Sequence, residues 1–272
     1  MGNPQYPKLS DALKQNGLWA NKALGQHFLL DENFCDKIAS LANDLSDKYV
    51  AEVGPGPGGL SRAILRQNPQ QFIMVEMDKR FEPLLAPLCQ ADTHASIYWG
   101  DALKTDIAAL FSVDKITLLS NLPYNIGTVL LINWLKQIQQ FDKLVLMFQK
   151  EVALRVCAQK GAQHYGRLAV MTNWLCETHL ALNVPPSAFT PPPKVHSAVI
   201  TVTPRPVPLI DVSFEAMEFI VGKAFNMRRK MLKRSLKDLN IPWEDLDIDP
   251  TLRPEMLDIE DFGKIAQYWQ NF

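Results

Sequence analysis

The segment from Asn121 to Tyr124 combines groups that could bind and activate an amine on a planar ring. Such an amine is a poor nucleophile because its lone pair is delocalised into the ring. Two acceptors that bind both amine hydrogens favour a tetrahedral nitrogen and aim its lone pair at an electrophile. The Asn121 side-chain oxygen and a main-chain oxygen at Asn121 or Leu122 could supply them. Pro123 would hold the turn through its fixed φ, and Tyr124 could stack on a flipped base such as adenine. The alternative is an ordinary strand-to-helix turn with a buried tyrosine.

A glycine-rich turn earlier in the chain predicts a nucleotide-like cofactor. Gly54, Gly56 and Gly59 fit the pattern G-x-G-x-x-G between an expected strand and an expected helix, and Glu76 follows at the distance of an acid that binds ribose hydroxyls. A nicotinamide dehydrogenase and an S-adenosylmethionine methyltransferase both use such a turn. The glycines alone do not decide between them.

The surroundings of the glycine turn favour the methyltransferase. Glu52 precedes the turn on its strand, Pro55 stiffens it, and Asp101 follows the third expected strand. A carboxylate at Asp101 can accept a hydrogen bond from an adenine amine. Taken singly, Asp101 could equally be a helix N-cap and Glu76 a solvated strand end. A shared ligand is the better interpretation because the acids lie at successive strand ends. The dehydrogenase interpretation is rejected because it does not explain residues 121–124.

The elements that must position these residues alternate in a βαβ pattern. Apolar runs that predict strands lie at 49–54, 72–77, 96–100, 116–121, 143–149, 179–184 and 197–204, and helical spacing occurs at 59–67, 80–90 and 127–138. Alternation from residue 49 to about 156 predicts an α/β fold with a parallel sheet. Ligands of such sheets bind beyond the carboxyl ends of the strands, where Asn121 is expected.

The proline cluster at 204–208 marks a shift in composition, after which the chain is expected to be helical to residue 272. We therefore predict two domains, 1–206 and 207–272. A basic segment lies in the second, with an expected helical apolar stripe; the basic residues are Lys223, Arg228, Arg229, Lys230, Lys233, Arg234 and Lys237, and the stripe is Phe225, Leu232, Leu236 and Leu239. A solvated basic helix is the alternative to an RNA anchor.

Composition excludes several classes of protein. The net charge is −1, so only the basic segment, and not the whole chain, indicates a nucleic-acid partner. The cysteines and histidines show no ligand spacing, and no serine-nucleophile motif occurs, so no metal is expected. No apolar run approaches the roughly 20 residues of a membrane span, and the N-terminus lacks a secretory pattern. We expect a cytoplasmic protein with no membrane contact.

Four motifs together resemble the KsgA/RsmA family, the ribosomal RNA small-subunit adenine dimethyltransferases. They are KALGQHFL at 22–29, EVGPGPGGL at 52–60, Asn-Leu-Pro-Tyr at 121–124 and FTPPPKVHS at 189–197. The resemblance runs from about residue 15 to about residue 237. It implies a Rossmann-like S-adenosylmethionine-dependent methyltransferase sheet with helices on both faces, a cofactor site lined by the motif at 22–30, and a small all-helical C-terminal domain that binds RNA.

The resemblance also implies roles for individual residues. The cofactor-binding set is His27, Leu29, Gly54, Gly56, Glu76, Asp101 and Asn121; the catalytic set is Asn121, Leu122, Pro123, Tyr124 and Phe189; and the RNA-binding set is Arg228, Arg229, Lys230, Lys233 and Arg234. Phe189 would cover the second face of the target adenine, unless it is a core phenylalanine beside a proline loop. Many relatives have asparagine at position 27, where this chain has histidine.

The expected reaction is the transfer of methyl groups from S-adenosyl-L-methionine to N6 of two adjacent adenosines, with S-adenosyl-L-homocysteine as the product. The family's substrate is a hairpin loop near the 3′ end of 16S rRNA in the pre-30S small subunit, and we expect a monomer. Two alternatives remain: a large-subunit adenine methyltransferase of the antibiotic-resistance type, and a ribosome assembly factor without catalysis.

Overall fold

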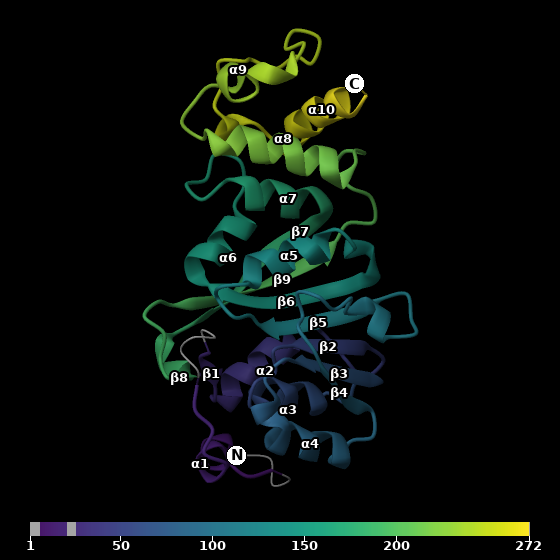
Figure 1. Cartoon of the computed structure of the whole chain (residues 1–272), viewed down its shortest axis with the longest axis vertical. Helices are drawn as coiled ribbons and strands as arrows, with labels where there is room; N and C mark the ends of the chain where they lie inside the picture. The colour runs from purple at the N-terminus through teal and green to yellow at the C-terminus, as the bar shows by residue number, and fades with distance from the viewer. Residues whose placement is uncertain (1–5, 21–25, 272) are drawn as a thin grey trace. The chain divides into compact units, whose positions relative to one another are not determined.

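The computed structural model covers the whole chain and describes residues 6–20 and 26–271 (Figure 1). The strands are β1 (Phe28–Leu29), β2 (Tyr49–Val53), β3 (Gln71–Glu76), β4 (Ala95–Trp99), β5 (Ile116–Asn121), β6 (Phe141–Gln149), β7 (Cys176–Val184), β8 (Phe189–Thr190) and β9 (Ser197–Pro204). The α-helices are α1 (Leu9–Gln15), α2 (Glu32–Ser40), α3 (Gly59–Leu65), α4 (Glu82–Ala91), α5 (Gly127–Leu135), α6 (Lys150–Cys157), α7 (Arg167–Leu175), α8 (Phe214–Asn226), α9 (Leu232–Ser235) and α10 (Ile259–Gln270). Short 3₁₀ helices include Lys79–Phe81, Pro186–Ala188 and Lys237–Leu239.

The main sheet has seven strands in the order β4-β3-β2-β5-β6-β9-β7. Neighbours from β4 to β6 are parallel, which confirms the prediction for residues 49–156. The strands expected at 179–184 and 197–204 also join the sheet as β7 and β9. β9 runs antiparallel to β6, so the sheet is mixed rather than wholly parallel.

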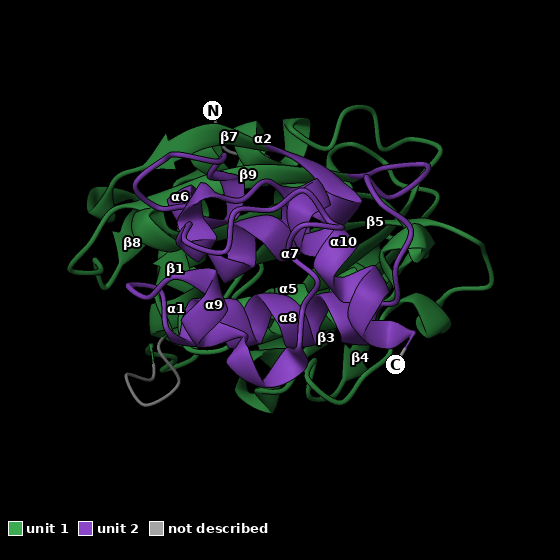
Figure 2. Ribbon diagram, turned by 90° about the horizontal axis from the view of Figure 1, so that it is seen from above, with its two compact units in different colours: residues 1–153, 179–203 green, residues 154–178, 204–272 purple. Residues whose placement is uncertain are grey.

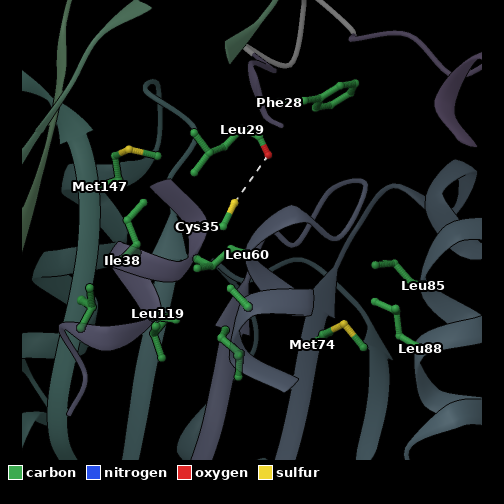
Figure 3. Close-up of a cluster of buried hydrophobic side chains, with 14 of the residues drawn as sticks. Phe28, Leu29, Cys35, Ile38, Leu60, Met74, Leu85, Leu88, Leu119 and Met147 are labelled. Carbon is green, nitrogen blue, oxygen red and sulfur yellow. Dashed lines mark hydrogen bonds between the residues drawn. The ribbon is translucent and has the colours of Figure 1, made fainter. Parts of the chain in front are cut away.

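Helices cover both faces of the sheet. On one face, residues from α2, α3 and α4 form a hydrophobic cluster with strand residues such as Met74, Leu119 and Met147 (Figure 3). On the opposite face, the first residue of α5, Gly127, packs so closely that an added Cβ would lie 3.0 Å from Phe148 of β6. Successive strand residues point to opposite faces of a sheet. Met147 therefore faces the layer of α2, α3 and α4, and Phe148 faces α5.

The short strands β1 and β8 form a separate antiparallel pair that the sequence did not predict. Phe28 pairs with Thr190 and Leu29 with Phe189. The Cys35 thiol of α2 lies 3.9 Å from the Leu29 carbonyl oxygen, its hydrogen-bond acceptor (Figure 3). The β1–β8 pair thus connects residues 28–29 of the N-terminal motif with the proline-containing motif at 189–197.

The chain divides into two compact units (Figure 2). Unit 1 contains residues 1–153 and 179–203, and unit 2 contains residues 154–178 and 204–272. Unit 2 therefore includes residues 154–178, which a single cut of the chain near residue 206 would assign to the first domain. The division into domains at 206/207 remains a prediction.

Unit 2 is mainly helical and has its own core. The rings of Phe225 and Phe262 lie 5.6 Å apart between centroids, and the Trp174 Nε1–H donates to the Ile210 carbonyl at 2.9 Å. The C-terminal part of the chain was expected to be all helical, but residues 240–253 form turns and irregular structure. Asn240 and Asp247 have positive φ there.

The prediction of one helical stripe from Phe225 to Leu239 is wrong. Helix α8 ends at Asn226, a turn follows, and α9 begins at Leu232. The backbone N–H of Leu232 donates to the Leu252 carbonyl, and that of Lys233 donates to the Pro250 carbonyl. Tertiary hydrogen bonds thus replace the helical ones. Leu232 and Leu236 are buried as expected, but they lie on the short helix α9 and at its C-cap, separate from Phe225 on α8.

Candidate active site

A pocket of about 250 Å³ lies in unit 1 at the carboxyl ends of β2, β3, β4 and β5. Strand register places these ends together, since Val53 pairs with Val75 and Glu76 with Trp99. All the residues predicted to bind the cofactor line this pocket: His27, Leu29, Gly54, Gly56, Glu76, Asp101 and Asn121. Residues 22–25 of the N-terminal motif lie outside the described residues.

The glycine turn depends on backbone conformations that other residues rarely adopt. Gly54 has φ +71° and Gly56 has φ +54°. A Cβ at Gly54 would meet no protein atom within 4 Å, so the space beside it is open to a ligand. Gly59 is required for a different reason, because its Cβ would lie 2.3 Å from the Leu29 carbonyl oxygen. The third glycine thus lets β1 pass against α3.

The Glu76 carboxylate joins the glycine turn to the end of β3. Its Oε2 accepts from the Gly56 N–H at 3.0 Å, and its Oε1 accepts from the Met77 and Asp78 N–H groups, both at 2.8 Å. Burial raises the pKa of Glu76, while these backbone bonds oppose the rise. The side chain is therefore a buried and oriented acceptor rather than a solvated strand end.

Asp101 lies at the pocket, as the ligand-binding interpretation made from the sequence requires, but it is not a helix N-cap, because residues 102–104 form a turn. Its Oδ1 accepts from the Leu103 N–H at 3.0 Å, so the side chain caps the turn that follows β4. The same residue also lines the pocket, together with the partly exposed Leu103 and Met77. A carboxylate can accept several hydrogen bonds, so capping the turn leaves it able to bind a ligand.

The charge of the pocket distinguishes the two cofactor classes. Its lining contains four acids, Glu52, Glu76, Asp78 and Asp101, of which Glu52 has a pKa raised to about 8 and is neutral at pH 7, and no lysine or arginine occurs among the described residues that line it. A dinucleotide brings a negatively charged pyrophosphate, which such a lining would repel. A cofactor with a sulfonium cation and ribose hydroxyls is suited to it.

Glu52 is the most deeply buried of these acids. It is 1% exposed, and its Oε2 accepts from the Ser61 hydroxyl. The pKa of Glu52 is raised to about 8, chiefly by burial; the Ser61 hydrogen bond opposes the rise, and the nearby Glu76 carboxylate adds to it. The folded protein therefore holds a proton on Glu52 over a pH range in which an unfolded glutamate has lost it.

This raised pKa predicts how pH affects the stability of the cofactor-free protein. Because the folded-state pKa lies above the ordinary value of 4.5, the contribution of Glu52 to stability falls as pH rises from about 4.5 to about 8. Glu52→Gln removes that loss, so we expect its Tm to exceed that of the unaltered protein by several degrees at about pH 9, and by little at about pH 5. Thermal unfolding checks this, with the exposed Glu82→Gln as control. An equal Tm difference at both pH values would contradict it.

The segment from Gln26 to Leu29 crosses the pocket and is held at several points. The Gln26 Nε2 donates to Asp78 Oδ2 at 3.1 Å, and the Asn121 Nδ2 donates to the His27 carbonyl at 3.4 Å. The second contact is important for chemistry, because an amide whose nitrogen is bound to the protein can present its oxygen to a substrate.

The four residues of the predicted catalytic turn also line the pocket. Leu122 is buried, whereas Asn121, Pro123 and Tyr124 are half-buried. The Tyr124 hydroxyl lies 2.7 Å from the Ser197 Oγ, and its ring stacks with that of His27. Burial raises the pKa of Tyr124, so its hydroxyl stays protonated at neutral pH.

Phe189 is the one predicted catalytic residue that does not line the pocket. Its side chain is 3% exposed and belongs to the hydrophobic cluster of unit 1. Its backbone pairs with Leu29, which does line the pocket. In this conformation Phe189 is a core residue next to the site, as in the alternative interpretation made from the sequence.

The predicted RNA-binding residues are exposed in unit 2. Arg228, Arg229 and Lys230 lie in the turn after α8, and Lys233 and Arg234 lie on α9. Arg228 differs from the others because its guanidinium binds Glu255 at 2.8 Å and the Gln163 carbonyl at 3.2 Å. Arg228 therefore has a structural role within unit 2.

Sequence reasoning missed three polar contributors to the site. Gln26 and Asp78 line the pocket, and Ser197 contacts Tyr124. The quoted motifs contain Gln26 and Ser197, but no spacing rule indicated their partners. Within residues 6–20 and 26–271, no group of three or more His, Cys, Asp or Glu side chains is placed to hold a metal ion. None of the helices in this part of the chain could cross a membrane.

Comparison with known proteins agrees with this geometry. The family model for ribosomal RNA adenine dimethylase matches residues 17–267. A protein of Gluconobacter oxydans (strain 621H) named ribosomal RNA small subunit methyltransferase A is 45% identical over 264 residues, which cover 96% of this chain and 87% of that protein. The fold and site thus define a Rossmann-like methyltransferase. The chain belongs to the ribosomal RNA adenine dimethylase family.

Two solved structures support the fold. A dimethyladenosine transferase from Plasmodium falciparum has a TM-score of 0.78 and 27% identity, covering 90% of this chain and 98% of that chain. The 23S rRNA methyltransferase ErmE has a TM-score of 0.68 and 24% identity, covering 89% of this chain and 99% of that chain. The likeness to ErmE concerns the fold alone.

Proposed function

We propose that this protein transfers methyl groups from S-adenosyl-L-methionine to N6 of adenosines in the RNA of the small ribosomal subunit, giving N6,N6-dimethyladenosine. The main support is one pocket that combines acids at the ends of β2, β3 and β4 with the Asn121–Tyr124 turn at the end of β5. The relative named ribosomal RNA small subunit methyltransferase A supports the choice of subunit. The family resemblance further indicates two adjacent adenosines in a hairpin loop near the 3′ end of 16S rRNA.

The residues of the pocket fit S-adenosyl-L-methionine. Glu76 and Asp101 offer carboxylate oxygens for ribose hydroxyls and an adenine amine, and the open space at Gly54 admits a ligand close to the backbone. His27, Leu29 and Gly56 complete the predicted binding set. When bound, the cofactor supplies an electrophilic methyl group on a sulfonium, and S-adenosyl-L-homocysteine is the product.

The protein's contribution to the chemistry is to position the target amine. With Nδ2 bound to the His27 carbonyl, Asn121 can accept one amine hydrogen through Oδ1. A main-chain carbonyl at Asn121 or Leu122 can accept the other, which localises the nitrogen lone pair. No general base is required, since a nitrogen that has gained a methyl group becomes acidic enough to release its proton to water.

Tyr124 is proposed to stack on the flipped adenine. We expect Tyr124→Ala to lower turnover by about 100-fold, because base stacking contributes roughly 1–3 kcal/mol. Tyr124→Phe keeps the ring and should lose less than about tenfold. Initial rates on undermodified small subunits measure both effects. Equal losses in the two variants would instead indicate that the hydroxyl is the essential group.

The exposed basic residues of unit 2 are proposed to anchor RNA. Phosphate contacts by lysine and arginine position RNA with little sequence information, and RNA specificity comes from unstacked loops and shape. Arg229, Lys230, Lys233 and Arg234 are the main candidates. Arg228 is a weaker one because its guanidinium is bound to Glu255. The monomeric state, the absence of a metal and the cytoplasmic location stay predictions.

Methyl transfer to separated subunits tests the proposal. Labelled S-adenosyl-L-methionine is supplied with undermodified small subunits and, in parallel, with large subunits. We expect label in small-subunit RNA alone. Label only in the large subunit would place the protein with the resistance-type methyltransferases, and binding to small subunits without transfer would indicate an assembly factor.

A further inference from the structure

The segment from Ala188 to Ser197 makes two side-chain hydrogen-bond contacts with the candidate active site. The His27 Nδ1 lies 2.8 Å from the Pro191 carbonyl oxygen, and the Tyr124 hydroxyl lies 2.7 Å from the Ser197 Oγ. The same segment includes β8, which pairs with the strand that follows His27. One loop therefore contacts two separate parts of the pocket.

These contacts fix two aromatic rings against each other. A carbonyl oxygen can only accept, so His27 must donate to Pro191 through a protonated Nδ1. The His27 and Tyr124 rings are stacked, with centroids 5.7 Å apart and planes 29° apart. Tyr124 is thus held at one face by His27 and at its hydroxyl by Ser197.

Burial makes the contact with Ser197 specific. Ser197 is 0% exposed, and a buried hydroxyl without a hydrogen bond is unfavourable. Tyr124 provides its partner, and either oxygen can donate. A ring restrained at two points loses less freedom when a base stacks on it, which favours binding of the base in the reactive geometry.

We infer that Ser197 and His27 are positioning residues that hold the Tyr124 ring for the target base, and that the 188–197 segment promotes the reaction through them. The inference rests on the proposed function and extends it. The 188–197 segment then acts through Ser197 and His27. Phe189 need not touch the base, which agrees with its burial.

A double-mutant cycle between Tyr124 and Ser197 tests the inference. Ser197→Ala and Tyr124→Phe each remove the same hydrogen bond, so each should lower kcat on undermodified small subunits by about 3- to 10-fold. The double variant should be no slower than the slower single variant. The affinity for S-adenosyl-L-homocysteine should stay within about twofold of the unaltered protein. Additive losses, or turnover at the unaltered rate in Ser197→Ala, would overturn the inference.

Stability is controlled in two ways. The double variant removes both hydroxyls, so it leaves no buried group unpaired even if Tyr124→Phe alone is destabilised. Thr172→Val serves as a matched control, because Thr172 is 0% exposed and its hydroxyl donates only to the Leu168 carbonyl of its own helix. The Tm of the Thr172→Val variant is expected to fall, while its kcat stays at the unaltered value. A loss of kcat in this control equal to that of Ser197→Ala would show a merely structural effect and overturn the inference.

The His27 contribution is tested at saturating cofactor. His27→Phe keeps a ring, His27→Asn keeps a donor for Pro191, and His27→Ala keeps neither. We expect the lowest kcat for alanine and partial recovery in the other two. Unchanged kcat for His27→Ala at saturating cofactor would limit His27 to cofactor binding and overturn its positioning role. If the unaltered protein transfers no methyl group, the proposed function itself fails; if it does and Ser197→Ala is normal, only this inference fails.

Discussion

Asn121→Ala should lower kcat on undermodified small subunits by about 1,000-fold, because it removes the acceptor that localises the lone pair of the target amine. The cofactor affinity should change only a few-fold, since Glu76, Asp101 and the glycine turn remain. Initial rates with labelled S-adenosyl-L-methionine measure the first quantity, and calorimetry with S-adenosyl-L-homocysteine measures the second.

Asn183→Ala is a matched control for this substitution, because Asn183 is exposed on β7 and does not line the pocket. Its rate should equal that of the unaltered protein. Turnover of Asn121→Ala within a few-fold of that rate would refute the catalytic assignment. A large loss of cofactor affinity with kcat preserved would make Asn121 a cofactor-binding residue only.

Reversing the charge of Arg229, Lys230 and Lys233 to glutamate should weaken binding to small subunits by at least about 100-fold at moderate salt, because each lost phosphate contact lowers affinity. The salt dependence of binding should also become shallower. Binding of labelled particles over a range of salt concentrations measures both effects. Cofactor affinity should not change, since the pocket lies in unit 1 and these residues lie in unit 2.

The matched control carries the same change of charge elsewhere. Lys8, Lys14 and Lys115 are exposed residues of unit 1, and their replacement by glutamate alters the net charge equally. Particle binding should be weakened much less by this control. Unchanged binding in the first triple variant would refute the RNA anchor. Equal weakening in both variants would show that the loss of binding comes from the net charge of the protein and not from these three residues.

The parallel part of the fold was predictable because its strands have a clear apolar pattern and end in recognisable polar groups. Glu76, Asp101 and Asn121 each follow such a strand, and the structure brings all three to one pocket. Parallel strands linked by helices place their carboxyl ends at the same edge, so the pocket followed from the order of the elements.

The remainder depends on contacts between distant residues. The helical pattern through residues 225–239 ignored the hydrogen bonds of Leu232 and Lys233 to Leu252 and Pro250, which replace helical ones. Likewise, the burial of Phe189 and the contact of Ser197 with Tyr124 follow from the pairing of β8 with β1. Two-residue strands have too few residues for a periodic pattern.

Nucleoside mass spectrometry of the reaction product tests the central claim, that this pocket methylates the N6 amine of adenine. Small-subunit RNA is digested after reaction with the protein and S-adenosyl-L-methionine, and the modified nucleosides are identified and located. The account predicts N6,N6-dimethyladenosine at two adjacent positions, and a far smaller amount after the same reaction time with Asn121→Ala. Methyl groups on another base, on ribose or on a ring nitrogen of adenine would contradict it.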